Sequence, residues 1–590
     1  MVRRVLTQAR GAGVAGGLNW AAAAVVLALA TAVLHGGAVF AGWIYDDAPQ
    51  LRFAATHAPW QYFFVPAVMR QQSYAHITPF NSFFYDLGLP LFGLNAAGHH
   101  VHLLLVLWLA ALATWFLLRP WVGAGLALAG ALLWLAMPPT GVVAHLLMTG
   151  HYAYGLLFSA LALAAFARAV RSDSARWAVL SALCYGLACL CKGLYVPLLL
   201  VFVAWPGLPW RRRLRLTAAT VVVGAAYAAW RLQVLGGIGG YAALAGGPAT
   251  LRLDPASLLG GLHALQESVF GIGWSGWLAL ALMLVVVVIA AASTRRSTAP
   301  GFVGACAAAL LAPVLPLVLF NLPYGLGRVA LLIGFGVVVL FTWQLSRLRL
   351  WGRRGALVQL GLVVALFGLL AFGQRHAMDG AVAEQRALST ANDFLIHGDP
   401  KEYLVAEGLG SINYLLAMRE VVFRVQGRVA PRVVETDDEL VALGPTRGAA
   451  AWAWQPVCDC LQRMGDAYGP RVAAIQSRWT AGEPLALGVK ARIDDNGRVK
   501  TFRWHFSGSP GQHRVEVRHM VLLDLSASGA LAFGLDQTFW PPEPAQLRFS
   551  VMAADGAVKR SPWMPLSLST TGALHWDSEQ DRPGSPIMPP

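Results

Sequence analysis

Long apolar segments restrict the fold of this 590-residue chain more than any other feature. A membrane core about 30 Å thick needs roughly 20 apolar residues in a helix. Stretches of that kind occur near residues 19–41, 100–118, 122–137, 151–170, 176–191, 193–206, 216–233, 275–294, 300–320, 328–345 and 355–373. The sequence therefore predicts a polytopic α-helical membrane protein with about 11 transmembrane helices. A composition of 57% hydrophobic and 13% charged residues excludes an ordinary soluble globule.

The acidic residues divide the chain into two parts. Only six of the 30 precede residue 375. We therefore predict a transmembrane domain over 1–374, with outer loops 42–98 and 236–274, followed by a soluble part. A mixed α/β segment is expected over 375–465. Alternating apolar runs separated by turns such as "DDNG" predict a β-rich, sandwich-like module over 466–578. The tail 579–590 has the composition of a disordered segment.

The positions of the basic residues predict the orientation of the chain. With a cytoplasmic N-terminus, 17 arginines before residue 375 fall inside, whereas six basic residues fall outside. By the positive-inside rule we expect the C-terminal module to be extracytoplasmic, that is, periplasmic in a bacterial inner membrane protein. The first apolar segment resembles a signal peptide, but it is long enough to span and we interpret it as a retained anchor. Because the arginines lie in short loops, the net charge of +15 does not indicate nucleic-acid binding.

An acidic pair follows the first apolar segment directly. Asp46 and Asp47 in "YDDAPQL" are the first acidic residues of the chain. A single carboxylate there would often be a helix cap. Two adjacent ones at the mouth of a membrane domain favour a functional role, as a general base on an acceptor hydroxyl or as a ligand that holds a divalent cation against a phosphate.

The first outer loop carries a recognisable order of motifs. The acidic pair is followed by "PWQYFF" and by "PFNSFFYDLGLPLFGLNAAGHHVHLLL", and later segments include "LACLCKGLYVPLLL" and "LPYGLGRVALLIGFG". Together, over about residues 15–345, they resemble the GT-C superfamily of polyprenyl-phosphate-sugar-dependent glycosyltransferases. The resemblance is greatest to the protein O-mannosyltransferase branch, which includes the transmembrane tetratricopeptide-containing mannosyltransferases.

This resemblance implies an activity and a set of site residues. It implies transfer of a sugar from a polyprenyl-phosphate donor to a hydroxyl acceptor on a protein, glycan or lipid. Asp46 or Asp47 would be the catalytic base, and Arg328 and Lys192 would bind the donor phosphate. The alternative for Arg328 is an interfacial arginine that reaches the lipid headgroups. Possible further contacts are His100, His145 and Glu267.

The chain also departs from the family pattern. Where the family has a second acidic residue this chain has Val142 and Val143 near His145, and Lys-Glu and Glu-Arg become Lys192-Gly193 and Gly327-Arg328. These departures keep open a second hypothesis, a non-catalytic, transporter-like or scaffold membrane protein of the same fold. The need for a divalent metal also stays open. A zinc site among His99, His100, His102, His145 and His151 is a weaker hypothesis, because their spacing matches no ligand pattern.

Cys458 and Cys460 are the two cysteines of the soluble part. Their separation leaves a disulfide and two free thiols equally plausible.

Overall fold

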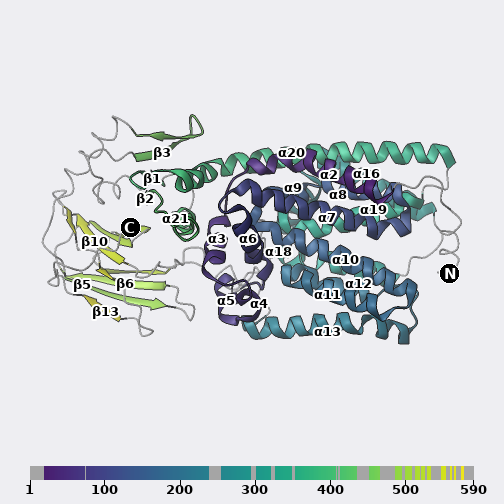
Figure 1. Ribbon diagram of the computed structural model, residues 1–590, viewed down its shortest axis with the longest axis horizontal. Coiled ribbons are helices and arrows are strands. Elements are labelled where there is room, and N and C mark those ends of the chain that lie inside the picture. Colours follow the sequence, from purple (N-terminus) through teal and green to yellow (C-terminus); the bar gives the residue numbers. More distant parts are fainter. Residues whose placement is uncertain are drawn as a thin grey trace. The chain divides into compact units, whose positions relative to one another are not determined.

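The computed structural model of the chain describes residues 19–73, 75–237, 254–293, 300–319, 326–347, 352–406, 408–409, 412–434 and 451–464. After residue 485 it describes the strands alone (Figure 1). The chain divides into two compact units. Unit 1 contains residues 1–41 and 57–384, and unit 2 contains residues 42–56 and 385–590. Part of the first outer loop therefore belongs to unit 2.

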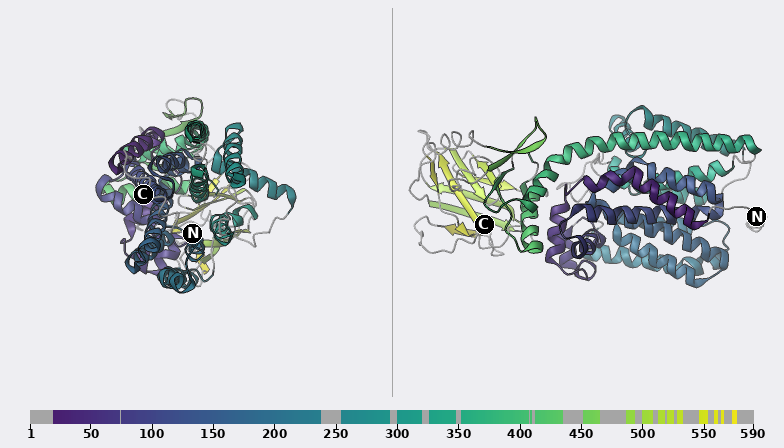
Figure 2. Two further views of the ribbon diagram at one scale, coloured as in Figure 1. Left: turned by 90° about the vertical axis from the view of Figure 1, so that its right-hand side faces the viewer. Right: turned by 45° about the horizontal axis from the view of Figure 1, so that its top comes forward.

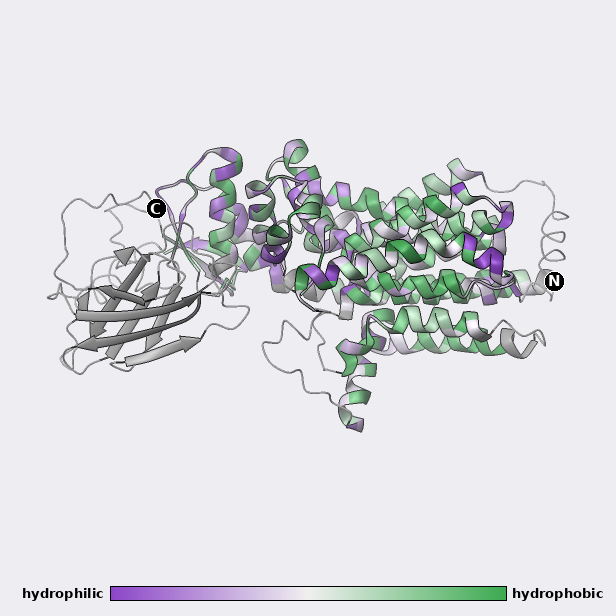
Figure 3. Cartoon of the chain, turned by 90° about the horizontal axis from the view of Figure 1, so that it is seen from below, coloured by the Kyte–Doolittle hydropathy of each residue, from purple (hydrophilic) through white to green (hydrophobic). Residues whose placement is uncertain are grey.

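Unit 1 is a bundle of apolar helices (Figures 2 and 3). Among the described residues, six helical segments are long and apolar enough to cross a membrane. They are α2 with η1 (Trp20–His35, Gly36–Phe40), α7 (Ala96–Val122), η2 with α10 (Leu147–Thr149, Gly150–Ser172), α13 (Trp210–Leu235), α19 (Leu326–Arg347) and the first part of α20 (Gly352–His397). The chain is thus a multi-pass membrane protein.

Two bent helix pairs raise the number of candidate spans to eight, if each pair is one span. The first pair, α8 (Ala124–Ala136) and α9 (Pro138–His145), bends by 59°. The second pair, α15 (Pro255–Phe270) and α16 (Trp274–Ser293), bends by 86°. Shorter helices of unit 1 include α11 (Ala175–Cys191), η3 (Gly193–Leu198), α12 (Leu199–Val203), α17 (Pro300–Leu311) and α18 (Leu315–Leu319).

The sequence predicts about 11 transmembrane helices, whereas six to eight candidate spans are found among the described residues, because several of the apolar segments form helices that are short or sharply broken. Pro138 begins α9 directly after Met137, which has extended backbone angles. Lys192 is also extended and ends α11, and the following turn η3 contains Pro197. Proline disfavours the helical conformation of the residue before it, so the break at Met137 has a local cause that hydropathy alone does not show.

Small residues allow the helices of unit 1 to approach closely, as is usual in membrane bundles. A Cβ atom at Gly155 of α10 would lie 2.1 Å from the ring of Tyr195 in η3. The hydroxyl of Ser181 in α11 donates a hydrogen bond of 2.8 Å to the carbonyl of Ala162 in α10. Substitution of Gly155 by a larger residue would therefore push η3 away from α10, and Lys192 lies just before η3.

Three short helices in unit 1 follow the first span: α4 (Gln61–Phe64), α5 (Pro66–Gln72) and α6 (Pro79–Phe92). Trp60 and Phe64 beside α4 are 57% and 76% exposed. Exposed aromatic side chains on short helices next to membrane spans are typical of segments that lie in the membrane interface. Residues 238–253 of the second outer loop, with most of its glycine-rich sequence, lie outside the described part.

Unit 2 contains a small α/β layer. Strands β1 (Tyr403–Val405), β2 (Arg432–Val434) and β3 (Ala451–Gln455) are parallel in the order β2-β1-β3, and β4 (Cys460–Arg463) pairs antiparallel with β3. The helix α21 (Ile412–Gln426) connects β1 to β2, and it packs against α3 (Asp47–Thr56). Cys458 and Cys460 form a disulfide at the β3–β4 turn, which decides between the two states that the sequence left open.

The rest of unit 2 forms two antiparallel sheets, in the region for which the sequence predicts a β-rich module. One contains β13 (Ala573–Trp576), β5 (Ala486–Ile493), β6 (Val499–Ser507) and β9 (Ser528–Ala532) in that order. The other has the order β11-β10-β7-β8, with β12 paired to β10. Its strands are β7 (Gln512–Val517), β8 (Met520–Asp524), β10 (Gln546–Met552), β11 (Val558–Arg560) and β12 (Met564–Pro565).

Candidate functional site

Three cationic side chains act electrostatically on one histidine at an end of unit 1. His76 lies in the loop between α5 and α6, and Lys192, Arg231 and Arg328 each act on it electrostatically. The cations come from the end of α11, the last turns of α13 and the first turn of α19. We call these four residues the cationic cluster.

Lys192 is held in a buried position. Its side chain is 9% exposed, and its Nζ lies 5.5 Å from the centroid of the Tyr152 ring, within cation–π range. Its backbone N–H donates to the carbonyl of Ala188 as the last bond of α11, and its own carbonyl accepts from the N–H of Tyr195. The break after α11 therefore fixes the backbone of Lys192 at both sides. A buried ammonium group in a membrane protein is costly, which favours a functional role for this residue.

Arg231 connects α13 to the loop that carries His76. Its guanidinium donates to the carbonyl of Ala75 at 3.1 Å and to the hydroxyl of Tyr227 at 3.4 Å. Nearby, Arg70 of α5 donates to the carbonyl of Val234 at 3.3 Å. These bonds attach the loop to the end of α13, so the position of His76 is set by arginines from two directions.

Arg328 is the third residue of α19 and is half-buried. The first turn of a helix carries backbone N–H groups without intrahelical partners and a partial positive charge, which together favour anions. An arginine at this position adds a planar fork that can bind two oxygens of one phosphate. Gly327 before it is also close to Val142, since a Cβ atom added there would lie 3.8 Å from the Val142 side chain.

The pKa of His76 reports the field in this cluster. Burial lowers it far below the ordinary value, and the positive charges of Lys192, Arg231 and Arg328 lower it further. His76 is therefore a neutral imidazole at physiological pH. The cluster consequently presents a strong positive potential, and its best complement is a multiply charged anion such as a phosphate group.

This field leads to a prediction about pH. The folded protein resists protonation of His76, whereas the unfolded chain takes up a proton below about pH 6.5. The contribution of His76 to stability is therefore present above that pH and is lost as the pH falls, by at most about 1.4 kcal/mol per pH unit. We expect His76→Gln to weaken the fall in melting temperature between pH 6.5 and 4.5, measured in one detergent. Identical profiles for wild type and variant would contradict this account.

Asp46 and Asp47 belong to unit 2 and differ in environment. Asp47 is the first residue of α3 and fully buried, and its Oδ2 accepts a hydrogen bond of 2.8 Å from the backbone N–H of Ile44. Asp46 is half-buried in the turn before α3. Tyr45 adopts a left-handed conformation with φ of 45°, so the chain turns sharply just before the acidic pair.

Unit 2 fixes the segment of the acidic pair by contacts on both sides. The side-chain amide of Asn392 in α20 donates to the carbonyl of Trp43 at 2.9 Å. Arg52 of α3 lies 3.7 Å from the carboxylate of Glu420 in α21. Gly42, with φ of +71°, passes so close to Ser389 that a Cβ atom would lie 2.1 Å from its hydroxyl. The position of the pair therefore depends on the other residues of unit 2.

Three further contact residues were proposed from the sequence, and each has its own surroundings. His100 is fully buried near the start of α7. His145 ends α9, where its Nδ1 is 3.0 Å from the carbonyl of Gly141. Glu267 of α15 pairs with His263 one turn earlier at 3.4 Å, and both side chains are partly exposed. The structure thus gives His145 and Glu267 partners within their own helices.

The histidines do not gather into a ligand set. His99 Nε2 is 3.0 Å from the carbonyl of Gly93, and His102 Nε2 is 2.5 Å from the hydroxyl of Tyr154. In the part of the chain that the structure describes, no group of three or more His, Cys, Asp or Glu residues is placed to hold a metal ion. The hypothesis of a protein-built zinc site gains no support.

Sequence reasoning missed His76, Arg231 and Tyr152 as neighbours of Lys192. For Arg231 the sequence indicated only that it is one of the six basic residues on the predicted outer side. The approach of Arg231 to Lys192 and to the loop of His76 depends on the contacts of α13 with α5 and α11, and no local pattern contains it.

Comparisons with solved structures find similarity to ArnT from Cupriavidus metallidurans. The structure bound to undecaprenyl phosphate is 17% identical over 74% of this chain and 93% of that chain, with a TM-score of 0.38. The apo structure is 17% identical over 80% and 97%, with a TM-score of 0.41. The Archaeoglobus fulgidus oligosaccharyltransferase tethered with an acceptor peptide is 12% identical over 83% and 74%, with a TM-score of 0.38. Neither a protein-family model nor a curated protein matches the chain. At this level of similarity, the activity must be argued from the residues of the chain itself.

Proposed function

We propose that this protein is a membrane glycosyltransferase that transfers a sugar from a polyprenyl-phosphate-linked donor to a hydroxyl group of a protein, glycan or lipid. The observation that carries the proposal is the cationic cluster, in which Lys192, Arg231 and Arg328 each act electrostatically on the neutral His76. The sequence resemblance to the GT-C superfamily assigns the same role to Lys192 and Arg328.

A lipid-linked phosphate fits the chemistry of the cluster. Its negative charges are matched by two guanidinium groups and one ammonium group, and charge-assisted bonds of this kind are about twice as strong as neutral ones. The cluster lies at the ends of apolar helices, where a prenyl chain can remain in the hydrocarbon while its phosphate reaches polar groups. During transfer the sugar–phosphate bond breaks and charge builds up on the leaving phosphate, which the same cations stabilise.

We assign Asp46 as the general base that takes the proton of the acceptor hydroxyl, and Asp47 as the residue that holds the turn. The full burial of Asp47 and its bond to the N–H of Ile44 support a structural role for it. Asp46 keeps a partly accessible carboxylate. The β-rich module of unit 2 would help to receive or position the acceptor.

One observation favours a second candidate function. Val142 lies beside Gly327, directly before Arg328, at a place where the family that the sequence resembles has an acidic residue. An apolar contact there cannot hold a metal or a second base. This arrangement suits a non-catalytic protein of the same fold, a transporter-like or scaffold subunit that binds a lipid phosphate without using it.

The experiment that tests the proposal uses the full-length protein in lipid with a synthetic polyprenyl-phosphate sugar and cell-envelope material as acceptor. A glycosyltransferase should release polyprenyl phosphate and label the acceptor. Binding of the lipid without release would favour the non-catalytic function. Absence of both binding and release would contradict the proposal.

We further propose that the protein lies in a bacterial inner membrane with its N-terminus cytoplasmic and unit 2 periplasmic, because of the asymmetry of the arginines. Cysteine introduced near residue 500 should then react with a membrane-impermeant maleimide in intact spheroplasts. An Arg212→Cys site should react only after lysis. Labelling of Arg212→Cys in intact spheroplasts would overturn this orientation.

A further inference from the structure

The opposite end of unit 1 is also strongly basic. The helix α10 runs for 23 residues, roughly 35 Å, from the side of the cationic cluster to the loop at Asp173. Four helices begin or end at this second end, and each brings arginine. The arginines at this end include Arg119 of α7, Arg168 and Arg171 of α10, Arg176 of α11, and Arg212 and Arg215 of α13.

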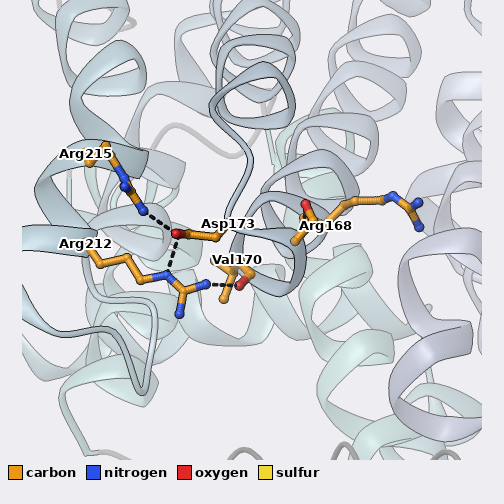
Figure 4. Close-up of polar contacts among 6 residues, drawn as sticks. Arg168, Val170, Asp173, Arg212 and Arg215 are labelled. Atoms are coloured by element: carbon orange, nitrogen blue, oxygen red, sulfur yellow. Dashed lines mark hydrogen bonds and ion pairs between the residues drawn. The ribbon is translucent and has the colours of Figure 1, made fainter.

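Asp173 forms ion pairs with two of these arginines (Figure 4). It follows α10 with a left-handed conformation, φ of 52°. Its two carboxylate oxygens accept from Arg212 at 2.8 Å and from Arg215 at 2.5 Å, and Arg212 also donates to the carbonyl of Val170. The start of α13 is thereby joined to the end of α10, and the charge of Asp173 is already used within the protein.

Arg168 and Arg171 contact aromatic side chains and not Asp173. Figure 4 shows Arg168 directed away from Asp173. Its guanidinium lies 5.4 Å from the ring of Trp177, and that of Arg171 lies 5.9 Å from the ring of Trp121. In the described parts of the chain, neither arginine forms an ion pair with a carboxylate, and the two positive charges act on each other across one helical turn.

The tryptophans beside them are partly open to the surroundings. Trp121 is 47% exposed and Trp177 is 37% exposed. The ring of Trp121 also lies 6.3 Å from that of Trp205, and the carbonyl of Trp205 accepts from Arg213 in the first turn of α13. Tryptophan is enriched where membrane meets water, because its ring suits both the acyl chains and the polar headgroups. Arginine next to it reaches the level of the phosphates.

Orientation of the helices alone does not account for this arrangement. Arginines that only fix topology need no aromatic neighbours, whereas Arg168 and Arg171 each lie over a tryptophan ring. Two like charges one turn apart also repel each other. An anion held between Arg168 and Arg171 would relieve that repulsion, and basic surfaces between helix ends are known binders of lipid headgroups.

We propose that Arg168 and Arg171, with Trp121 and Trp177 beside them, bind the phosphate headgroup of an anionic membrane phospholipid. The guanidinium groups pair with the phosphate oxygens, and the indole rings pack against the glycerol and upper acyl chain. A free phosphate ion has the same charge but no acyl chain. The site therefore prefers the lipid to the ion.

The test measures lipid retention by native mass spectrometry of the full-length protein in detergent, titrated with phosphatidylglycerol, phosphatidylcholine or inorganic phosphate. Wild type should bind phosphatidylglycerol at least tenfold more tightly than phosphatidylcholine, and inorganic phosphate should not compete at millimolar concentration. Arg168→Gln with Arg171→Gln should remove this preference, with an expected loss of about tenfold or more. Arg375→Gln removes an exposed arginine near the other end of the spanning part of α20 and should leave the preference unchanged.

Two further experiments, a variant that keeps both positive charges and photolabelling of the wild type, test the same proposal independently. Arg168→Lys with Arg171→Lys should retain part of the preference, since an ammonium group cannot pair two oxygens at once. A photoactivatable phosphatidylglycerol should label wild-type peptides that contain Trp121 or Trp177. An unchanged preference in the double glutamine variant, equal binding of inorganic phosphate, or labelling confined to other helices would each overturn the proposal.

Discussion

Asp46→Asn should lower sugar transfer by about 10²–10⁴-fold, the usual effect of removing a general base. The amide keeps the size and most hydrogen bonds of the carboxylate but cannot take the proton of the acceptor hydroxyl. Asp46 is half-buried and lies outside the regular turns of α3, so unit 2 should fold normally in this variant. The measurement is the rate of transfer by the purified variant in lipid, together with its melting temperature.

Asp47→Asn is the matched control for that variant. The side-chain oxygen of asparagine can still accept the hydrogen bond that Ile44 N–H donates to Asp47 Oδ2 in the wild type. We therefore expect measurable transfer, with a lower melting temperature because a buried charge-assisted bond becomes a neutral one. If Asp47→Asn abolishes transfer and Asp46→Asn does not, the roles of the two residues are exchanged. Full activity in the double variant would exclude both as the base.

Arg328→Ala should weaken the binding of the polyprenyl-phosphate donor by about 10–100-fold, because a hydrogen bond to a charged group contributes about 1.5–3 kcal/mol. The affinity for the acceptor should change little. Arg328→Lys should recover part of the donor affinity, since a point charge remains but the fork is lost. The donor affinity is measured by equilibrium binding of the polyprenyl phosphate to each variant in nanodiscs.

Arg375→Ala serves as the control for this series, because it removes an exposed arginine of the same unit. Its donor affinity should equal that of the wild type. Unchanged donor affinity in both Arg328 variants would remove Arg328 from the site and leave the interpretation of an interfacial arginine.

The positions of the helices followed from the sequence because each apolar segment has a period and length that only a membrane or a buried helix can satisfy. The acidic pair and Lys192 stood out for a similar reason, since charges next to apolar runs are rare and costly. In the structure, Asp46 lies in the turn before α3, Asp47 is the first residue of α3, and Lys192 ends α11.

Other features depend on contacts that no local pattern contains. The sequence did not indicate that residues 42–56 belong with unit 2, because the contacts of α3 with α21 join segments more than 350 residues apart. The approach of Arg231 to Ala75 likewise joins α13 to a loop that precedes it by 156 residues. Such convergence of distant side chains is the part of a site that tertiary structure alone defines.

The most direct test of the central claim is an experimental structure of the full-length protein in a lipid nanodisc with a bound polyprenyl phosphate. We predict that the phosphate lies within hydrogen-bonding distance of Arg328 and of at least one of Lys192 and Arg231, beside His76. A phosphate bound elsewhere at saturating lipid, with the cationic cluster unchanged, would contradict the account.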